Sequence, residues 1–186
     1  MTTILHHIFR FMVTSMIVIS LFVSFGMTES QAQFLRLTFE IESELVAEEM
    51  TSLYFGEVVP NTGVIRIELG DPDMGTYAIT GPQNLTVDIN LDIPEYLELE
   101  GEEALQVPMN LEVAYANRNE NTVDHALPVT EGVARFPIHA EASPQLSPDD
   151  PVPSATAYLY VYGEIEVGDI PTGTYEAEVF MAVEYD

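Results

Sequence analysis

The strongest constraint on this fold is a strict two-residue alternation of apolar and polar side chains. Successive side chains of a β-strand point to opposite faces, so this pattern buries one face and exposes the other, whereas a helix repeats every 3.6 residues. The longest alternating stretches lie within Leu35–Ile41, Leu85–Ile93, Leu105–Tyr115, Ala157–Val167 and Tyr175–Tyr185. Each stretch is therefore predicted to be a strand with one face in a core.

Shorter apolar runs add further strand candidates at Leu53–Val58, Val64–Leu69, Thr76–Thr80 and Val133–Ala140. Turn residues separate them, and the proline-rich segment Ser143–Pro153 is predicted to be a loop. Glu44–Ser52 is the one segment that suggests a helical turn or a loop. This spacing favours an all-β fold: a single immunoglobulin-like antiparallel β-sandwich of about eight or nine strands.

Two residues in the C-terminal third have specific local predictions. Gly163 lies in the middle of an alternating stretch, which indicates a bulge or the close approach of another backbone. Tyr175 begins the last stretch directly after Gly173-Thr174. We expect its ring to be buried and its hydroxyl to bind a neighbouring backbone group, as corner tyrosines do in sandwiches.

The first 32 residues have the features of a secretory signal peptide. A weakly cationic start precedes the uncharged stretch Phe11–Phe25, and small residues Ser30 and Ala32 follow in the spacing of a cleavage site. The alternative is a membrane anchor, but the run falls short of the roughly 20 apolar residues that a span requires. We therefore expect a signal peptide at 1–32 and one domain at 33–186. The mature chain would have no membrane span and would be exported to the periplasm, the cell surface or the medium.

The charge of the chain excludes some partners. It carries 31 acidic residues against five Lys and Arg, a formal net charge of −26. Electrostatic attraction to nucleic acid or to anionic lipid is therefore ruled out. Lysine is absent. A high-salt habitat would explain the acid excess, since salt screens repulsion, and so would an acidic surface protein neutralised by Ca²⁺.

No motif of catalytic chemistry is present in the sequence, and we expect no enzyme activity and no resident cofactor. Cysteine is absent, which removes thiol catalysis. Loop carboxylates at Asp71, Asp73, Asp149 and Asp150 are the best candidates for a Ca²⁺ site. They do not match an EF-hand loop, and a solvated acidic loop is the alternative interpretation.

Three tyrosines share one face of a predicted strand: Tyr158, Tyr160 and Tyr162. They suggest an aromatic strip that stacks on sugar or on another subunit. The alternative is a sheet face that a loop covers, because tyrosine often fills half-buried strand faces.

Two segments together resemble a known family. The first is Leu53-Tyr54-Phe55-Gly56, followed by Val64-Ile65-Arg66-Ile67. The second is Val161-Tyr162-Gly163, followed by Gly173-Thr174-Tyr175 and Val183-Glu184-Tyr185. This pattern is similar to a bacterial exported domain family of unknown function related to the major subunits of Mat or common-pilus fimbriae. The resemblance implies an immunoglobulin-like sandwich with a pilin-like or surface-coat role, and it supplies no catalytic residues.

The segment Phe34–Ser43 is a candidate assembly strand. Its apolar residues Leu35, Leu37, Phe39 and Ile41 either pair within their own sandwich or complete the sheet of the next subunit. We therefore expect a structural subunit of a surface fibre or coat that associates with itself or with related subunits. A secreted monomeric module that binds carbohydrate or calcium is the alternative.

The signal-peptide prediction can be tested on the secreted protein. Cleavage after Ala32 should place the mature N-terminus within about two residues of Gln33, as read by mass spectrometry. Recovery of intact Met1–Phe25 in the membrane fraction would contradict it.

Overall fold

The computed structural model describes residues 33–41, 45–139 and 153–185. The predicted signal peptide at 1–32 lies outside the described residues. So does most of the predicted proline loop. No helix in the described ranges is long and apolar enough to cross a membrane.

The described chain is built almost entirely from strands, so the all-β prediction is confirmed. The elements are β1 (Gln33–Ile41), β2 (Val46–Thr51), β3 (Gly63–Ile67), β4 (Gly75–Pro82), β5 (Thr86–Asp92), β6 (Tyr96–Leu99), β7 (Glu102–Ala116), the 3-10 turn η1 (Val123–His125), β8 (Leu127–Pro128), β9 (Val133–Pro137), β10 (Ser154–Val167) and β11 (Tyr175–Tyr185). Eleven strands are hydrogen-bonded together, more than predicted.

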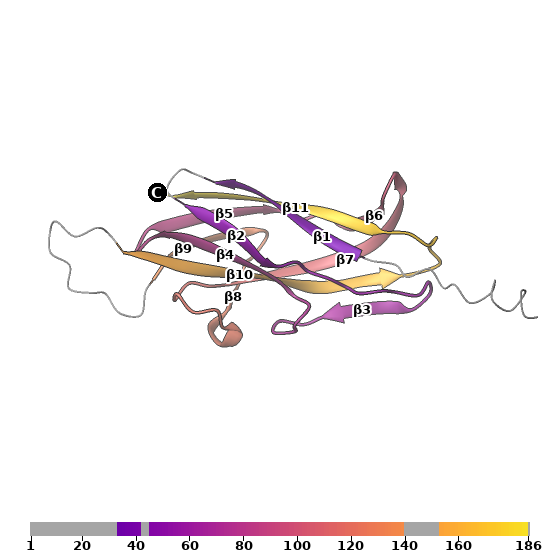
Figure 1. Ribbon diagram of the computed structural model, residues 1–186, viewed down its shortest axis with the longest axis horizontal. Coiled ribbons are helices and arrows are strands. Elements are labelled where there is room, and N and C mark those ends of the chain that lie inside the picture. Colours follow the sequence, from indigo (N-terminus) through magenta and orange to yellow (C-terminus); the bar gives the residue numbers. More distant parts are fainter. Residues whose placement is uncertain (1–32, 42–44, 140–152, 186) are drawn as a thin grey trace, which may run out of the picture. The chain divides into compact units, whose positions relative to one another are not determined.

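Strand β7 joins the two layers of the sandwich. Up to Pro108 it pairs with β6, and from Met109 onward it pairs with β10. One layer therefore contains β9, β5, β11, β1, β6 and the start of β7. The other contains β2, β4, β10, β3, β8 and the rest of β7. Figure 1 shows β11, β5 and β1 on one side and β10, β4 and β3 on the other. All ladders are antiparallel except that of β1 with β11.

Two local predictions were wrong, and one strand was not predicted. The segment expected to be a helical turn or loop contains β2, which pairs with β4. Backbone pairing with β4 outweighs the helical preference of its Glu, Ala and Met residues. Leu53–Val58 is not a continuous strand, although Leu53, Phe55 and Val58 are buried. The acidic segment that contains β6 was not predicted as a strand at all.

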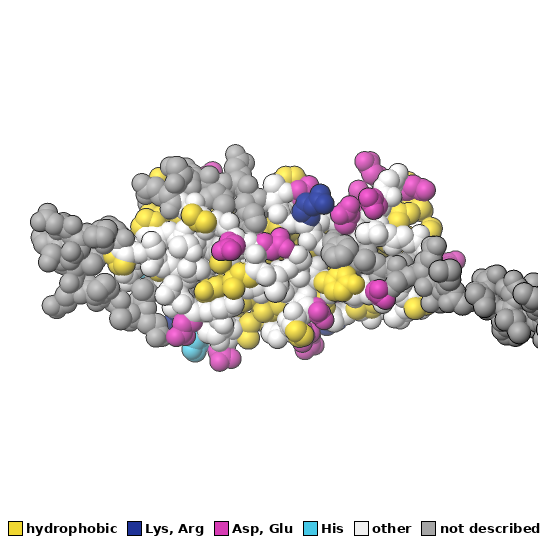
Figure 2. Space-filling model, viewed as in Figure 1, with side chains coloured by type: hydrophobic (Ala, Val, Ile, Leu, Met, Phe, Trp, Pro, Cys, Tyr) yellow, Lys and Arg dark blue, Asp and Glu magenta, His cyan; other side chains and the backbone are white. Residues whose placement is uncertain are grey.

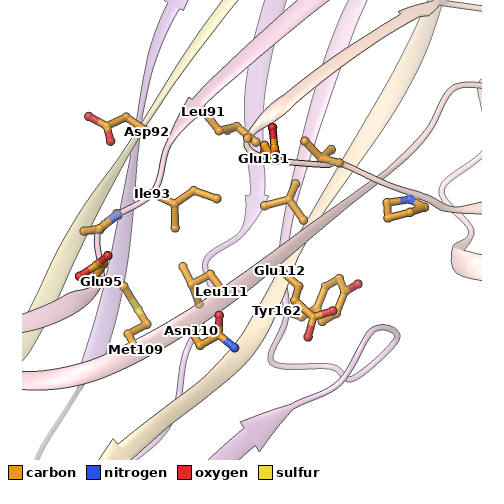
Figure 3. A pocket seen from close by; sticks show the side chains of 15 residues that line it. Leu91, Asp92, Ile93, Glu95, Met109, Asn110, Leu111, Glu112, Glu131 and Tyr162 are labelled. Atoms are coloured by element: carbon orange, nitrogen blue, oxygen red, sulfur yellow. The ribbon is translucent and has the colours of Figure 1, made fainter.

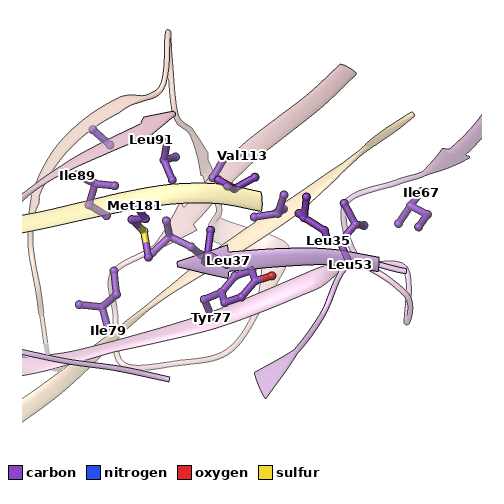
Figure 4. Close-up of a cluster of buried hydrophobic side chains, with 14 of the residues drawn as sticks. Leu35, Leu37, Leu53, Ile67, Tyr77, Ile79, Ile89, Leu91, Val113 and Met181 are labelled. Carbon is purple, nitrogen blue, oxygen red and sulfur yellow. The ribbon is translucent and has the colours of Figure 1, made fainter. Parts of the chain in front are cut away.

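The core lies between the two layers and consists of the inward faces of the alternating strands. Ile79 of β4, Ile89 of β5, Leu159 of β10 and Val179 of β11 are each at most 1% exposed. Figure 4 shows side chains from both layers meeting in this cluster. The predicted alternation therefore corresponds to real burial on both sheets.

Both predictions for the C-terminal third are confirmed. The Tyr175 ring is fully buried, and its hydroxyl donates a hydrogen bond to the carbonyl of Pro171 at 3.1 Å. Gly163 has a φ of 146° and lies against β7, where a Cβ atom would come within 2.2 Å of the Asn110 carbonyl oxygen. Only glycine combines this backbone conformation with so close an approach.

A single methyl group at this position should therefore destabilise the sandwich. We expect Gly163→Ala to lower the free energy of unfolding by about 1–3 kcal/mol, because β7 and β10 must separate locally. The control Gly168→Ala places its Cβ atom in open space and should change stability by less than about 0.5 kcal/mol. Equal urea midpoints for the two variants would contradict this account.

Candidate functional site

The candidate assembly strand β1 is attached to the sandwich along one side. It pairs in parallel with β11 over its whole length, from Gln33 opposite Tyr175 to Ile41 opposite Val183. Outside this ladder, the Leu35 amide donates a hydrogen bond of 3.3 Å to the Leu53 carbonyl. No other described strand forms a ladder with β1. β1 is therefore an edge strand, and it pairs in cis here.

The inward face of β1 contributes to the core. Leu35 is 3% exposed and Leu37 is 7% exposed. Figure 4 shows these two side chains entering the cluster that contains Leu53, Tyr77 and Met181. The side chains of Phe39 and Ile41, the other two predicted assembly residues, lie outside the described part of the structure. β1 therefore covers the β11 edge and part of the core beneath it.

The outward face of β1 makes polar contacts with β11. The Arg36 guanidinium lies 3.8 Å from a carboxylate oxygen of Glu176. The Thr38 hydroxyl donates a hydrogen bond to the Glu178 carboxylate. In each case the β1 residue reaches the glutamate two positions before its direct partner in the ladder. Arg36 and Thr38 therefore contact two successive outward glutamates of β11 with the same two-residue displacement.

Three edge strands each carry one arginine that pairs with a carboxylate on the neighbouring inner strand. The pairs are Arg36–Glu176 between β1 and β11, Arg66–Glu164 between β3 and β10, and Arg135–Asp88 between β9 and β5. The last two are hydrogen-bonded at 2.9 and 3.0 Å. The bond to Glu164 raises the pKa of Arg66. Sequence reading missed these pairs because the partners are far apart along the chain.

A groove of about 410 Å³ lies beside β1 on the outer face of its layer. Its charged lining residues are Arg36, Glu98, Glu100, Glu103, Glu176 and Glu178. Arg36 is thus the one cation among these described side chains. The exposed Tyr96 ring adds an apolar wall. The groove is an acidic environment into which β1 brings a positive charge.

A second cavity, of about 520 Å³, lies where β7 passes from one layer to the other (Figure 3). Apolar side chains such as Leu91, Met109 and Leu111 line it together with Asn110 and Tyr162. Its carboxylates come from four residues: Asp92, Glu95, Glu112 and Glu131. Burial, and next to it the charge of Glu112, raises the pKa of Tyr162. No lysine, arginine or histidine is among the described residues of its wall.

Two of the four predicted calcium residues, Asp71 and Asp73, lie in the described part of the chain. Asp71 closes a turn, because its carboxylate accepts the Glu68 amide at 2.7 Å and its carbonyl accepts the Met74 amide at 3.2 Å. Asp73 follows on the same turn. Asp149 and Asp150 lie outside the described residues. Within the described ranges, no three carboxylates or histidines are grouped closely enough to hold a metal ion.

The predicted tyrosine strip is covered at its centre. Tyr160 is fully buried, and its hydroxyl donates a hydrogen bond of 3.1 Å to Asn121. It packs with Ala114 and Ala116 beneath the connections that flank η1, while Tyr158 and Tyr162 are half-buried at its sides. Tyr160 is therefore closed to stacking ligands.

Figure 2 shows Asp and Glu scattered across one face with little basic charge among them. No family model and no curated protein matches the chain.

The burial of Tyr160 has a consequence at alkaline pH. Desolvation raises its pKa to about 12, above the ordinary value of about 10. The folded state therefore holds this proton more tightly than the unfolded state does. The resulting stabilisation is complete below about pH 10 and is lost as the pH rises through about 12.

We expect Tyr160→Phe to remove the tyrosinate absorbance component that titrates near pH 12 and to make the alkaline loss of stability shallower. Loss of the hydrogen bond to Asn121 should also cost about 0.5–1.5 kcal/mol at neutral pH. Tyr96→Phe, on an exposed ring, is the control and should leave that component in place. An unchanged titration of Tyr160→Phe would contradict the assignment.

Proposed function

We propose that this chain is a non-enzymatic structural subunit of a bacterial surface fibre or coat, assembled by donor-strand exchange of β1. The observation that carries the proposal is the double role of β1. It is an edge strand that pairs only with β11 among the described strands, and yet it places Leu35 and Leu37 in the core. A strand of this kind can complete either its own sandwich or that of a neighbour.

Burial supports the durability of such a joint. Each of the two leucines contributes roughly 1.5–3 kcal/mol when it is removed from water. The backbone hydrogen bonds between β1 and β11 form one continuous ladder and add to this stabilisation. The same contacts would form in cis and in trans, so exchange needs no new surface. The covalent link between β1 and its own domain favours pairing in cis, and a high protein concentration favours pairing in trans.

The sequence resemblance to fimbrial major subunits and the signal peptide expected at residues 1–32 support the same proposal. An exported sandwich with a terminal alternating strand has the features that a donor-strand fibre requires. Subunits of this kind associate with further copies of themselves or with related surface subunits, at the cell surface or in the periplasm.

The second candidate is a secreted monomeric module that binds carbohydrate or calcium. The cavity at the β7 crossing favours it, because a volume of about 520 Å³ lies in the usual range for small-molecule sites. Its carboxylates and its Asn110 amide could accept and donate hydrogen bonds to a polar ligand.

The fibre proposal is tested by deleting residues 34–43 and supplying them again as a peptide. The deleted protein should aggregate through the open β11 edge, and the peptide should restore a monodisperse sandwich in trans. Leu37→Asp in the peptide should abolish the rescue, because it would bury an unpaired carboxylate. Thr38→Ser keeps the hydroxyl and serves as the matched control.

Wild-type protein at high concentration should form fibres in negative-stain images. If it stays monomeric, and if the deleted protein unfolds beyond rescue by the peptide, the strand acts only in cis. The monomeric module would then be the better account.

A further inference from the structure

We propose that Arg36 determines which strand occupies the β11 edge, and in which register. The edge would accept a strand that carries a cation between two inward-facing apolar residues, and it would reject strands with a carboxylate there. The role of Arg36 holds for β1 of the same chain. Its extension to β1 of a second copy rests on the proposed donor-strand fibre.

The apolar face of β1 alone leaves the register open. A shift of two residues along β11 keeps Leu35 and Leu37 facing the core, because side chains alternate with a period of two. The outward-facing side chains of β1 distinguish between these registers. Arg36 and Thr38 each contact the side chain two positions before the ladder partner. A shift of two residues toward the end of β11 would therefore bring Thr38 to the exposed Phe180 in place of Glu178. The opposite shift would bring Arg36 to Thr174 in place of Glu176. The contacts of Arg36 and Thr38 with two successive glutamates therefore favour the observed pairing.

The surroundings of Arg36 also exclude other strands of this chain. The adjoining groove is lined by Glu98, Glu100 and Glu103 in addition to Glu176 and Glu178. Most alternating segments of this sequence carry acids on their polar face, as β5 does with Asp88 and Asp92. A carboxylate at the position of Arg36 would bring like charges together beside Glu176 and Glu178, where β1 has an arginine. The acid on the polar side of β1, Glu40, is paired with Ala182. In a chain with a net charge of −26, repulsion of this kind selects against wrong partners.

The ion pair of β1 is looser than those of the edge strands β3 and β9. Arg66 and Arg135 each form a hydrogen-bonded ion pair with the residue directly opposite in an antiparallel ladder. Arg36 approaches Glu176 only to 3.8 Å, and its side chain is 72% exposed. The attraction between Arg36 and Glu176 is thus that of an exposed ion pair, which salt readily screens.

Reciprocal charge reversal in the full mature protein tests the proposal. Arg36→Glu reverses the charge on β1, and Glu176→Arg reverses the charge on β11. The double variant carries both changes. Arg118→Glu and Glu166→Arg are the matched controls. They make the same charge changes at exposed residues, and Arg118 has no ion pair within the described ranges. Fibre yield by negative stain and Tm at low salt are the readouts.

Each single variant should lose most of its fibres relative to its control and lower the Tm by about 2–4 °C, the effect of about one surface-scale interaction in a chain of this length. The double variant should regain both properties. At about 1 M NaCl, where the Debye length is about 3 Å, the single variants and their controls should have similar fibre yields and Tm values. Arg36→Gln, which removes the charge without reversing it, should give an intermediate loss.

A mixture of the two single variants separates the proposals. In a donor-strand fibre, β1 of the Arg36→Glu copy would pair with β11 of the Glu176→Arg copy, where the charges are again opposite. The mixture should therefore form fibres that neither variant forms alone. Rescue in the double variant without rescue in the mixture would support Arg36 as the selector in cis and overturn the fibre. Single variants that behave like their controls, with no rescue in the double variant, would overturn the role of Arg36 and leave the fibre proposal standing.

Discussion

The described fold depends on the burial of one apolar face between two sheet layers. The chain has no cysteine and carries a net charge of −26, so its folded form must overcome strong self-repulsion without disulfides. Core residues such as Ile79, Leu159 and Val179 each contribute roughly 1.5–3 kcal/mol on burial. This requirement explains why alternation is kept so strictly along the long strands. A single polar residue on the inner face would weaken the force that holds the fold together.

Apolar burial cannot by itself fix how the strands align. A slip by two residues keeps every inward side chain inward, so register must come from other contacts. In the interior, the approach of Gly163 to Asn110 fixes β10 against β7. At the edges, an arginine on β1, β3 and β9 pairs with a carboxylate of the inner neighbour. A chain without lysine thus has three of its few cations at the positions where misalignment and wrong pairing are easiest.

The sequence predicted those parts of the fold that local alternation determines. β5, β7, β10 and β11 follow directly from it, and Tyr175 and Gly163 behave as their positions indicated. β2 was missed because nearly all its side chains are exposed, so it shows no alternation. Leu53 and Phe55 are buried without forming a continuous strand, because apolar residues in a short run report burial and not backbone pairing. The parallel pairing of β1 and the groove beside it join residues about 140 positions apart, as Thr38 and Glu178 are, and no local pattern reports such a contact.

The edge strands differ in what their departure would cost, and this difference points to β1. β2 pairs along one side but exposes nearly all its side chains, so its exchange would bury little. β3 and β9 are held by hydrogen-bonded ion pairs in antiparallel ladders. β1 alone combines core residues with a parallel ladder, the slightly weaker form of pairing, and with a longer ion pair. While seated in cis, it covers the β11 edge that would otherwise recruit other chains. The strand that covers this edge in cis is therefore the strand that the proposed fibre would transfer to a neighbour.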